Sequence, residues 1–184
     1  MQTFSRNVNV TMDWLDKTSF EIRGTLDDNV HSVAATLVLG YPDFTIKEAT
    51  GEITRMPYPG FCQGATVALA GLVGERIGRG FRKRAGEVLG GAESCNHLHT
   101  LITSMAACAF QMNYMAAKQR PDAEAMMQKV EDDPRLKREM VLHWMPQLRN
   151  SCFLFSEAKD ALFGITREAN AEDPSQSKSE LGEN

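Results

Sequence analysis

The hydrophobic period of this sequence changes once, across residues 56–60 (MPYPG). Before that segment, apolar residues alternate with polar ones, as at Val8, Val10 and Met12, which is typical of strands with one buried face. Within it, two prolines exclude both a helix and a central strand. After it, apolar residues recur every three or four positions, as they do in helices. The chain is therefore expected to fold as a sheet followed by helices.

Residues 1–56 predict four consecutive strands. Turn-forming residues separate these strands at 16–17, 27–29 and 40–43, where Asp, Asn, Gly and Pro favour tight connections. Strands joined by short turns pair antiparallel with their sequence neighbours. Their alternating pattern predicts one buried face and one solvated face.

Residues 95–118 predict one long core helix, because their apolar residues fall on a single stripe at helical spacing. Ser94, which follows a glycine pair at 90–91, is the candidate N-cap of this helix. The predicted fold class is α+β, with an N-terminal antiparallel β-meander packed against a C-terminal helical layer. The stripe consists of Leu98, Leu101, Ile102, Met105, Ala109, Met112 and Ala116.

We expect one domain over residues 1–167, followed by a polar, acidic tail at 168–184. The tail composition cannot bury enough apolar surface to fold alone, so an ordered tail would need a partner such as a second subunit. The shorter helices of the domain are expected at 62–73, at 77–89, from 133–134 toward Trp144, and at 155–165.

The net charge of −4 comes from the tail, which contains five acidic residues and one basic residue. The rest of the chain has no net charge. A neutral body argues against nucleic-acid binding, which needs a positive field. No apolar run approaches the roughly 18 residues that a membrane helix needs, and the N-terminus lacks a secretion signal. We expect a cytoplasmic protein that binds neither nucleic acid nor membrane. The four scattered cysteines are then expected to be thiols.

The segment at 90–99 (GGAESCNHLH) places one thiol and two imidazoles within five residues, and no other part of the chain groups these potentially reactive side chains as closely. On a regular helix, Cys95 and His99 lie on one side of the Leu98 stripe and His97 lies about 100° to the other side. A zinc ion held by all three is therefore not expected. A helix N-terminus lowers the pKa of a thiol, so Cys95 is a candidate thiolate and His97 a candidate general acid or base. The simpler alternative is that Cys95 is a buried small residue.

Three further features are candidates for the site. Tyr58, held between two prolines, either lines a pocket or covers the edge of the core. His31 follows the turn at 27–29, and a metal site would have to recruit it, or Asp27, from across the fold. Residues 76–84 contain five bases, which form either a solvated face or an anion pocket. On a helix, this cluster would place Arg76, Arg79 and Lys83 on one face.

Several nucleotide and hydrolase motifs are absent from the sequence. It has no P-loop, no GxSxG nucleophile elbow, no HExxH and no Rossmann glycine cluster. We therefore expect no organic cofactor.

The motifs together resemble a known family. Pro-Tyr-Pro-x-x-Cys at 57–62, Gly-x-Gly-Phe at 78–81, Gly-Gly at 90–91 and Ser-Cys-Asn-His-Leu at 94–98 are similar to the bacterial domain of unknown function 2889 family, over roughly residues 5–120. Family members usually carry Gly-Cys-Thr-His at the last motif, so Ser94 and Asn96 depart from the pattern. The resemblance implies a bacterial, cytoplasmic protein and favours Cys62, alongside residues already named, as a site residue. By analogy, it also implies a role in small-molecule catabolism, including that of aromatic acids.

The function expected from the sequence is that of a small-molecule catabolic lyase, which uses acid–base chemistry on an aromatic or carboxylate-bearing substrate. Two alternatives stay open: a non-catalytic ligand-binding or accessory protein, and a metal-dependent enzyme with Cys and His ligands. We also expect a homo-oligomer, and no metal ligand is assigned. The candidate catalytic residues are His97, Tyr58, His31 and Cys95, and the candidate substrate-binding residues are Arg76, Arg79, Arg82 and Cys62.

Overall fold

A computed structural model of the chain describes residues 3–92, 94–121, 123–130 and 133–164. The chain forms two compact units, Met1–Ala116 and Ala117–Asn184. The expectation of a single domain over 1–167 stays a prediction, and the acidic tail at 168–184 lies outside the described residues.

The first unit contains a four-stranded antiparallel sheet with the strand order β1-β2-β3-β4. The strands are β1 (Arg6–Asp16), β2 (Ser19–Asp28), β3 (Ser32–Gly40) and β4 (Ile46–Arg55). The predicted meander and the predicted α+β class are therefore confirmed. The turn between β2 and β3 has only three residues, so it brings the end of β2 against the start of β3.

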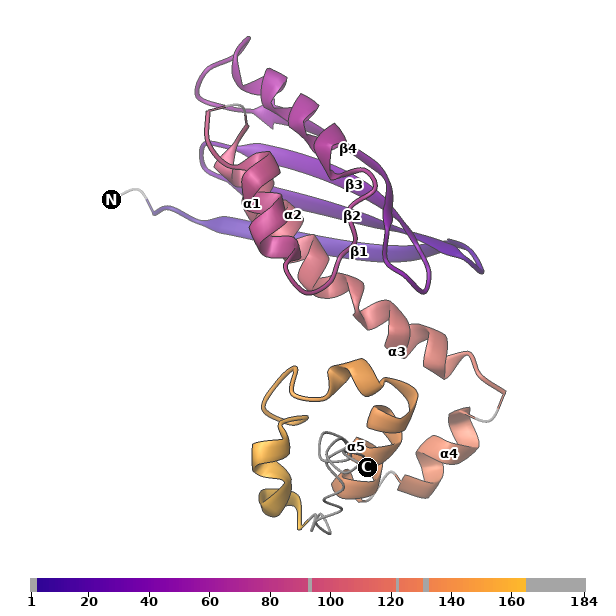
Figure 1. Ribbon diagram of the computed structural model, residues 1–184. Helices are drawn as coiled ribbons and strands as arrows, with labels where there is room; N and C mark the ends of the chain where they lie inside the picture. The colour runs from indigo at the N-terminus through magenta and orange to yellow at the C-terminus, as the bar shows by residue number, and fades with distance from the viewer. Residues whose placement is uncertain (1–2, 93, 122, 131–132, 165–184) are drawn as a thin grey trace, which may run out of the picture. The chain divides into compact units, whose positions relative to one another are not determined.

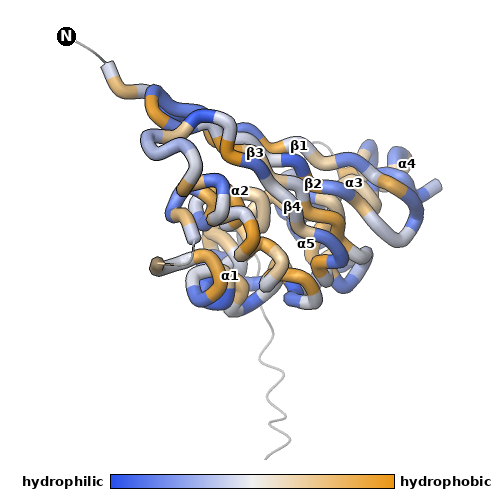
Figure 2. The backbone as a smooth tube through the Cα atoms, turned by 90° about the horizontal axis from the view of Figure 1, so that it is seen from above, coloured by the Kyte–Doolittle hydropathy of each residue, from blue (hydrophilic) through white to orange (hydrophobic). Residues whose placement is uncertain are grey.

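Alternation along the strands produces the buried face of the sheet. Phe20, Ile22 and Leu26 of β2 are fully buried and Gly24 is buried with them, whereas Glu21, Arg23 and Thr25 between them are partly or fully exposed. The same alternation appears as a change of colour along the strands in Figure 2. Successive side chains of a strand point to opposite faces, so only one face of the sheet enters the core.

Helical segments cover that buried face. These are the 3₁₀ segment η1 (Cys62–Leu72), α1 (Phe81–Leu89) and α2 (Asn96–Ala109). Figure 1 shows α1 and α2 side by side over the sheet, and α2 contacts β1, β2 and β3. The predicted stripe of α2 is confirmed, since Leu98, Leu101, Ile102 and Met105 are each fully buried. α2 begins one residue later than predicted, with Cys95 rather than Ser94 at the N-cap.

The predicted helix 95–118 is divided at Phe110 into α2 and α3 (Gln111–Lys118). Phe110 keeps helical dihedral angles, with φ −65° and ψ −16°. The next turn is tighter, because the backbone N–H of Asn113 donates to the carbonyl of Phe110 three residues earlier. The ring of Phe110 packs on Phe44, with 5.2 Å between the ring centroids. Hydrophobic spacing does not predict this break, because the apolar stripe continues across it from Ala109 to Met112.

Gly24 of β2 lies directly beneath α2. A Cβ atom at this position would lie 2.6 Å from Sδ of Met105 and 2.9 Å from Cδ1 of Leu101, and both of these side chains are fully buried. We therefore expect Gly24→Ala to destabilise the first unit by about 1–3 kcal/mol, the usual cost of overpacking a core. Denaturant unfolding measures this. Gly78→Ala is the matched control, since a Cβ there meets no atom within 4 Å, and equal stability of the two variants would contradict the close packing.

The second unit is helical in its described residues. It contains α4 (Ala123–Val130), α5 (Pro134–Trp144) and two 3₁₀ segments, η2 (Pro146–Leu148) and η3 (Glu157–Phe163). The Asp133 side chain caps α5 by accepting from the backbone N–H groups of Arg135 and Leu136. The helix predicted from 133–134 toward Trp144 is thus confirmed, and the one predicted at 155–165 is the shorter η3. Across the described residues, no helix is long and apolar enough to cross a membrane.

Candidate functional site

The candidate site lies at one end of the sheet, where β1 begins and β2 ends. Arg6, the first residue of β1, is paired in register with Asp28, the last residue of β2. The turn after Asp28 leads to His31, directly before β3. The N-terminus of α2 lies over this end of the sheet, because the ring of His97 stacks on the ring of His31 with 3.7 Å between centroids and 27° between planes. Residues of β1, β2 and α2 therefore meet here with His31 of the turn before β3.

Asp28 is the buried anchor of this arrangement, with 3% of its surface exposed. Its Oδ1 accepts hydrogen bonds from the backbone N–H groups of Val30 (2.8 Å) and His31 (2.7 Å). Its Oδ2 accepts from Nε (2.9 Å) and Nη2 (2.6 Å) of Arg6. Burial by itself raises the pKa of this carboxyl, but the two backbone donors, Arg6 and His31 together hold the pKa well below its usual range. Asp28 is thus a charged carboxylate at neutral pH.

His31 is oriented by Asp28, since its Nδ1 lies 3.2 Å from Oδ1 of Asp28. The turn that carries both residues is held by Arg55, the last residue of β4, whose Nη2 donates to the backbone carbonyls of Asp28 and His31. A carboxylate beside one ring nitrogen favours a hydrogen on that nitrogen and leaves the other as an acceptor. Asp28 therefore holds the ring of His31, and Arg55 holds its backbone.

Cys95 and His97 contact each other, with 3.5 Å between Sγ and Nδ1. The helical geometry that placed them on opposite sides of the stripe was wrong, because Cys95 is the N-cap and has extended backbone angles (φ −128°, ψ 127°). It therefore does not follow the 100° rotation per residue of the helix. Partial burial, and then the nearby charges of His31 and Arg6, lower the pKa of His97 below its ordinary value.

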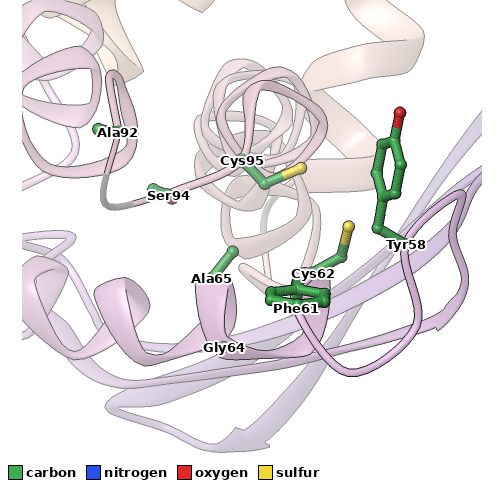
Figure 3. Close-up of a pocket in the computed structure, with 8 residues that line it drawn as sticks. All are labelled: Tyr58, Phe61, Cys62, Gly64, Ala65, Ala92, Ser94 and Cys95. Atoms are coloured by element: carbon green, nitrogen blue, oxygen red, sulfur yellow. The ribbon is translucent and has the colours of Figure 1, made fainter.

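A pocket of about 550 Å³ lies beside Cys95, within the first unit. Its described lining comes from the loop at 58–61, from the first residues of η1 and from the segment before α2, as Figure 3 shows. In that view the sulfurs of Cys62 and Cys95 are directed toward the space beside the ring of Tyr58. The lining residues are Tyr58, Phe61, Cys62, Gly64, Ala65, Ala92, Ser94 and Cys95.

The predicted site residues fall into two adjoining groups. Tyr58, Cys62 and Cys95 line the pocket. His97 and His31 are not among its described lining residues, but His97 is joined to the pocket wall through Cys95. His97 therefore stands one side chain away from the cavity. The catalytic and binding roles assigned to all five residues remain predictions.

The basic cluster is not arranged as the sequence predicted. A helix over 77–89 would put Arg76 and Arg79 on one face with Lys83, but α1 begins only at Phe81. Gly80 has φ +91°, a left-handed angle that glycine adopts readily and that ends any continuous helix here.

The arginines of this cluster are exposed and make local contacts. Arg76 donates from Nε to the backbone carbonyl of Asp43 at 2.8 Å. Arg79 and Arg82 are exposed, Arg79 before the helix and Arg82 on α1. The described part of the pocket lining includes none of the three, so their predicted role as a substrate clamp has no geometric support at this pocket.

Sequence reasoning missed Arg6 and Asp28. The run Asp27-Asp28-Asn29 was interpreted only as turn chemistry, and Asp27 was named as the acid within reach of a metal. Asp27 instead pairs with Arg55, at 2.6 Å between Oδ1 and Nη2. The two-residue period of the strand could have identified Asp28, because this residue continues the series of buried positions formed by Phe20, Ile22 and Leu26. A charged residue at a buried strand position needs a partner or a function.

Three of the described side chains could hold a metal ion. Asp28, His31 and His97 each offer one ligand atom, and these atoms all lie within 4.8 Å of one another. Two imidazole nitrogens and one carboxylate oxygen suit divalent transition metals.

The fold and the site define an α+β protein in which a four-stranded meander and one helix N-terminus gather Cys, His and Asp side chains beside a pocket. The model of the family described as protein of unknown function DUF2889 matches residues 5–111. This match covers more than half of the chain, so the chain belongs to that family, as the motifs at 57–62 and 94–98 predicted. The search of curated proteins and the search of solved structures each gave no match to this chain.

Proposed function

We propose that this protein is a small-molecule enzyme that performs acid–base chemistry of the lyase type, with Cys95 as the residue that meets the substrate. The observation that carries the proposal is the contact between Sγ of Cys95 and Nδ1 of His97 at 3.5 Å, on the wall of the pocket. A thiol beside an imidazole forms an acid–base pair, because one proton can move between sulfur and nitrogen.

The position of Cys95 supports this role. It is the N-cap of α2, a helix of 14 residues, and the unpaired N–H groups of a helix N-terminus stabilise a nearby negative charge. Cys95 therefore lies where negative charge is stabilised, whereas Cys108 lies near the opposite, C-terminal end of the same helix. In the proposed reaction, Cys95 removes a proton from a carbon atom next to a carbonyl group, and His97 keeps the sulfur in its reactive state.

The pocket lining indicates the kind of substrate. Its volume of about 550 Å³ lies within the range of small-molecule sites, roughly 300–1,000 Å³. The rings of Tyr58 and Phe61 and the methyl group of Ala65 offer an apolar, aromatic surface. This lining supports a substrate with an aromatic ring more than one recognised through its carboxylate, because the lining residues described are all uncharged. Tyr58 lines the pocket, and its hydroxyl group is the second candidate proton donor.

Exchange of carbon-bound hydrogen tests the first step of the proposed reaction, the removal of a proton from carbon. The protein is incubated in D₂O with a panel of aromatic carbonyl compounds that carry an acidic C–H group, and deuterium uptake is measured by mass spectrometry. We expect catalysed uptake into at least one compound, reduced by at least about 100-fold in Cys95→Ser. Cys108→Ser, which alters a thiol on α2 outside the described pocket lining, is the matched control and should exchange at the wild-type rate.

Two results would contradict this function. Uptake that Cys95→Ser leaves unchanged would remove Cys95 from the chemistry. Saturable binding of panel compounds without any exchange would favour the ligand-binding alternative, since a binding protein needs the pocket but not the acid–base pair.

A further inference from the structure

We propose that Asp28, His31 and His97 form a binding site for one divalent transition-metal ion of the zinc type. This inference goes beyond the proposed function and does not depend on it, because it rests on side chains outside the described pocket lining. The site joins the end of β2, the turn before β3 and the first turn of α2, so an ion here would link the sheet to the helix.

The distance between two of the ligand atoms fits a metal centre, and the third lies close to both. The three ligand atoms lie within 4.8 Å of one another, and Nδ1 of His31 is 3.2 Å from Oδ1 of Asp28. Two ligands that each lie about 2.0–2.2 Å from zinc in a tetrahedral arrangement are about 3.3–3.6 Å apart. An ion can therefore replace the hydrogen between Nδ1 and Oδ1 with little movement of either side chain.

The surroundings of Asp28 supply the support that metal ligands usually have. Oδ2 is held by Arg6, and Oδ1 also accepts two backbone N–H groups, so the carboxylate is fixed in place and charged. Such outer hydrogen bonds orient ligands and raise the affinity of metal sites. The exposed fractions of the Asp28 and His31 side chains are 0% and 19%, so the ion would be shielded by the end of the sheet and yet remain reachable from solvent.

His97 has a nitrogen for the ion on the side away from Cys95. Its Nδ1 lies against Sγ of Cys95, which leaves Nε2 as the ligand atom. With an ion on Nε2, Nδ1 carries a hydrogen directed at the sulfur, so the pairing of His97 with Cys95 is retained. Histidine nitrogens with one carboxylate select zinc, iron, cobalt or nickel over calcium and magnesium, which prefer all-oxygen sites.

Zinc titration of the full chain tests this site. The protein is stripped with EDTA and titrated with ZnCl₂ by isothermal calorimetry, and the bound metal is counted by elemental analysis after dialysis. We expect a single ion per chain, and His31→Gln and His97→Gln should each weaken zinc binding by at least about 100-fold, because each removes a ligand. His143→Gln, which changes an exposed histidine of α5, should bind zinc as the wild type does.

A Co²⁺-loaded sample identifies the ligand set by a second measurement. Nitrogen and oxygen ligation predicts visible d–d bands without sulfur-to-metal charge transfer, and Cys95→Ser should leave the spectrum unchanged. A sulfur-to-metal charge-transfer band that disappears in Cys95→Ser would overturn the assigned ligands.

In the zinc titration, wild-type affinity in both His31→Gln and His97→Gln, or no stoichiometric zinc in the wild type, would overturn the site itself. Circular dichroism of each variant excludes misfolding as the cause of lost binding. None of these readouts uses deuterium exchange, so failure here leaves the proposed function to its own test.

Discussion

His97→Gln is expected to reduce the deuterium exchange rate by at least about two decades, while the free energy of unfolding stays within about 1 kcal/mol of the wild type. The loss of activity follows from the contact between Nδ1 of His97 and Sγ of Cys95. Glutamine can still form a hydrogen bond, but it cannot exchange a proton near neutral pH as imidazole does. Stability should change little, because His97 is only partly buried and glutamine can still pack against the ring of His31.

The combination of the two outcomes distinguishes a functional His97 from a structural one. Exchange rates are measured on zinc-loaded and on EDTA-treated protein, and stability is measured by denaturant unfolding of EDTA-treated protein, where bound zinc makes no contribution. His143→Gln serves as the control, since this exposed histidine lies on α5 in the second unit. Unfolding of His97→Gln would make the residue structural. Full exchange activity in a folded variant would show that His97 takes no part in the chemistry.

The sheet and the buried face of α2 could be predicted because each depends on one local rule. Alternation along β2 and the stripe through Leu98 and Met105 need no information from elsewhere in the chain. The same rules failed where one residue departed from the ideal geometry. Gly80, with its left-handed φ, shortens the helix expected at 77–89 and thereby separates the basic residues that the sequence grouped on one face.

The chemistry of the site was predictable in part. The motif at 94–98 pointed to Cys95 and His97, and the proline-flanked loop pointed to Tyr58, all of which meet at or beside one pocket. The contact between Cys95 and His97 was not predictable, because it arises from the extended N-cap rather than from a helical turn. The role of Asp28 depends on pairing between β1 and β2 that brings Arg6 opposite to it, which is a long-range fact that no single segment contains.

Arg138→Leu is expected to destabilise the second unit by about 3–5 kcal/mol, because it breaks a buried ion pair by removing one partner. The Arg138 side chain on α5 is 1% exposed, and its Nη2 lies 2.6 Å from Oδ1 of Asp160 in η3, whose own side chain is 7% exposed. Its Nε also donates to the backbone carbonyl of Leu154 at 2.6 Å. Leucine offers neither the charge nor the donors of arginine, so the buried carboxylate of Asp160 loses this ion pair.

Hydrogen exchange of the α5 amides, followed by mass spectrometry, measures this loss in the second unit alone. Arg135→Leu is the matched control, since Arg135 on the same helix is exposed and pairs with Asp133 at 3.4 Å. Exposed pairs of this kind contribute about 0–1 kcal/mol, so α5 should keep nearly its wild-type protection in that variant. The double variant Arg138→Leu/Asp160→Leu should recover part of the loss, because it leaves no buried carboxylate at position 160. Equal protection of α5 in Arg138→Leu and Arg135→Leu would show that the pair with Asp160 does not hold η3 against α5.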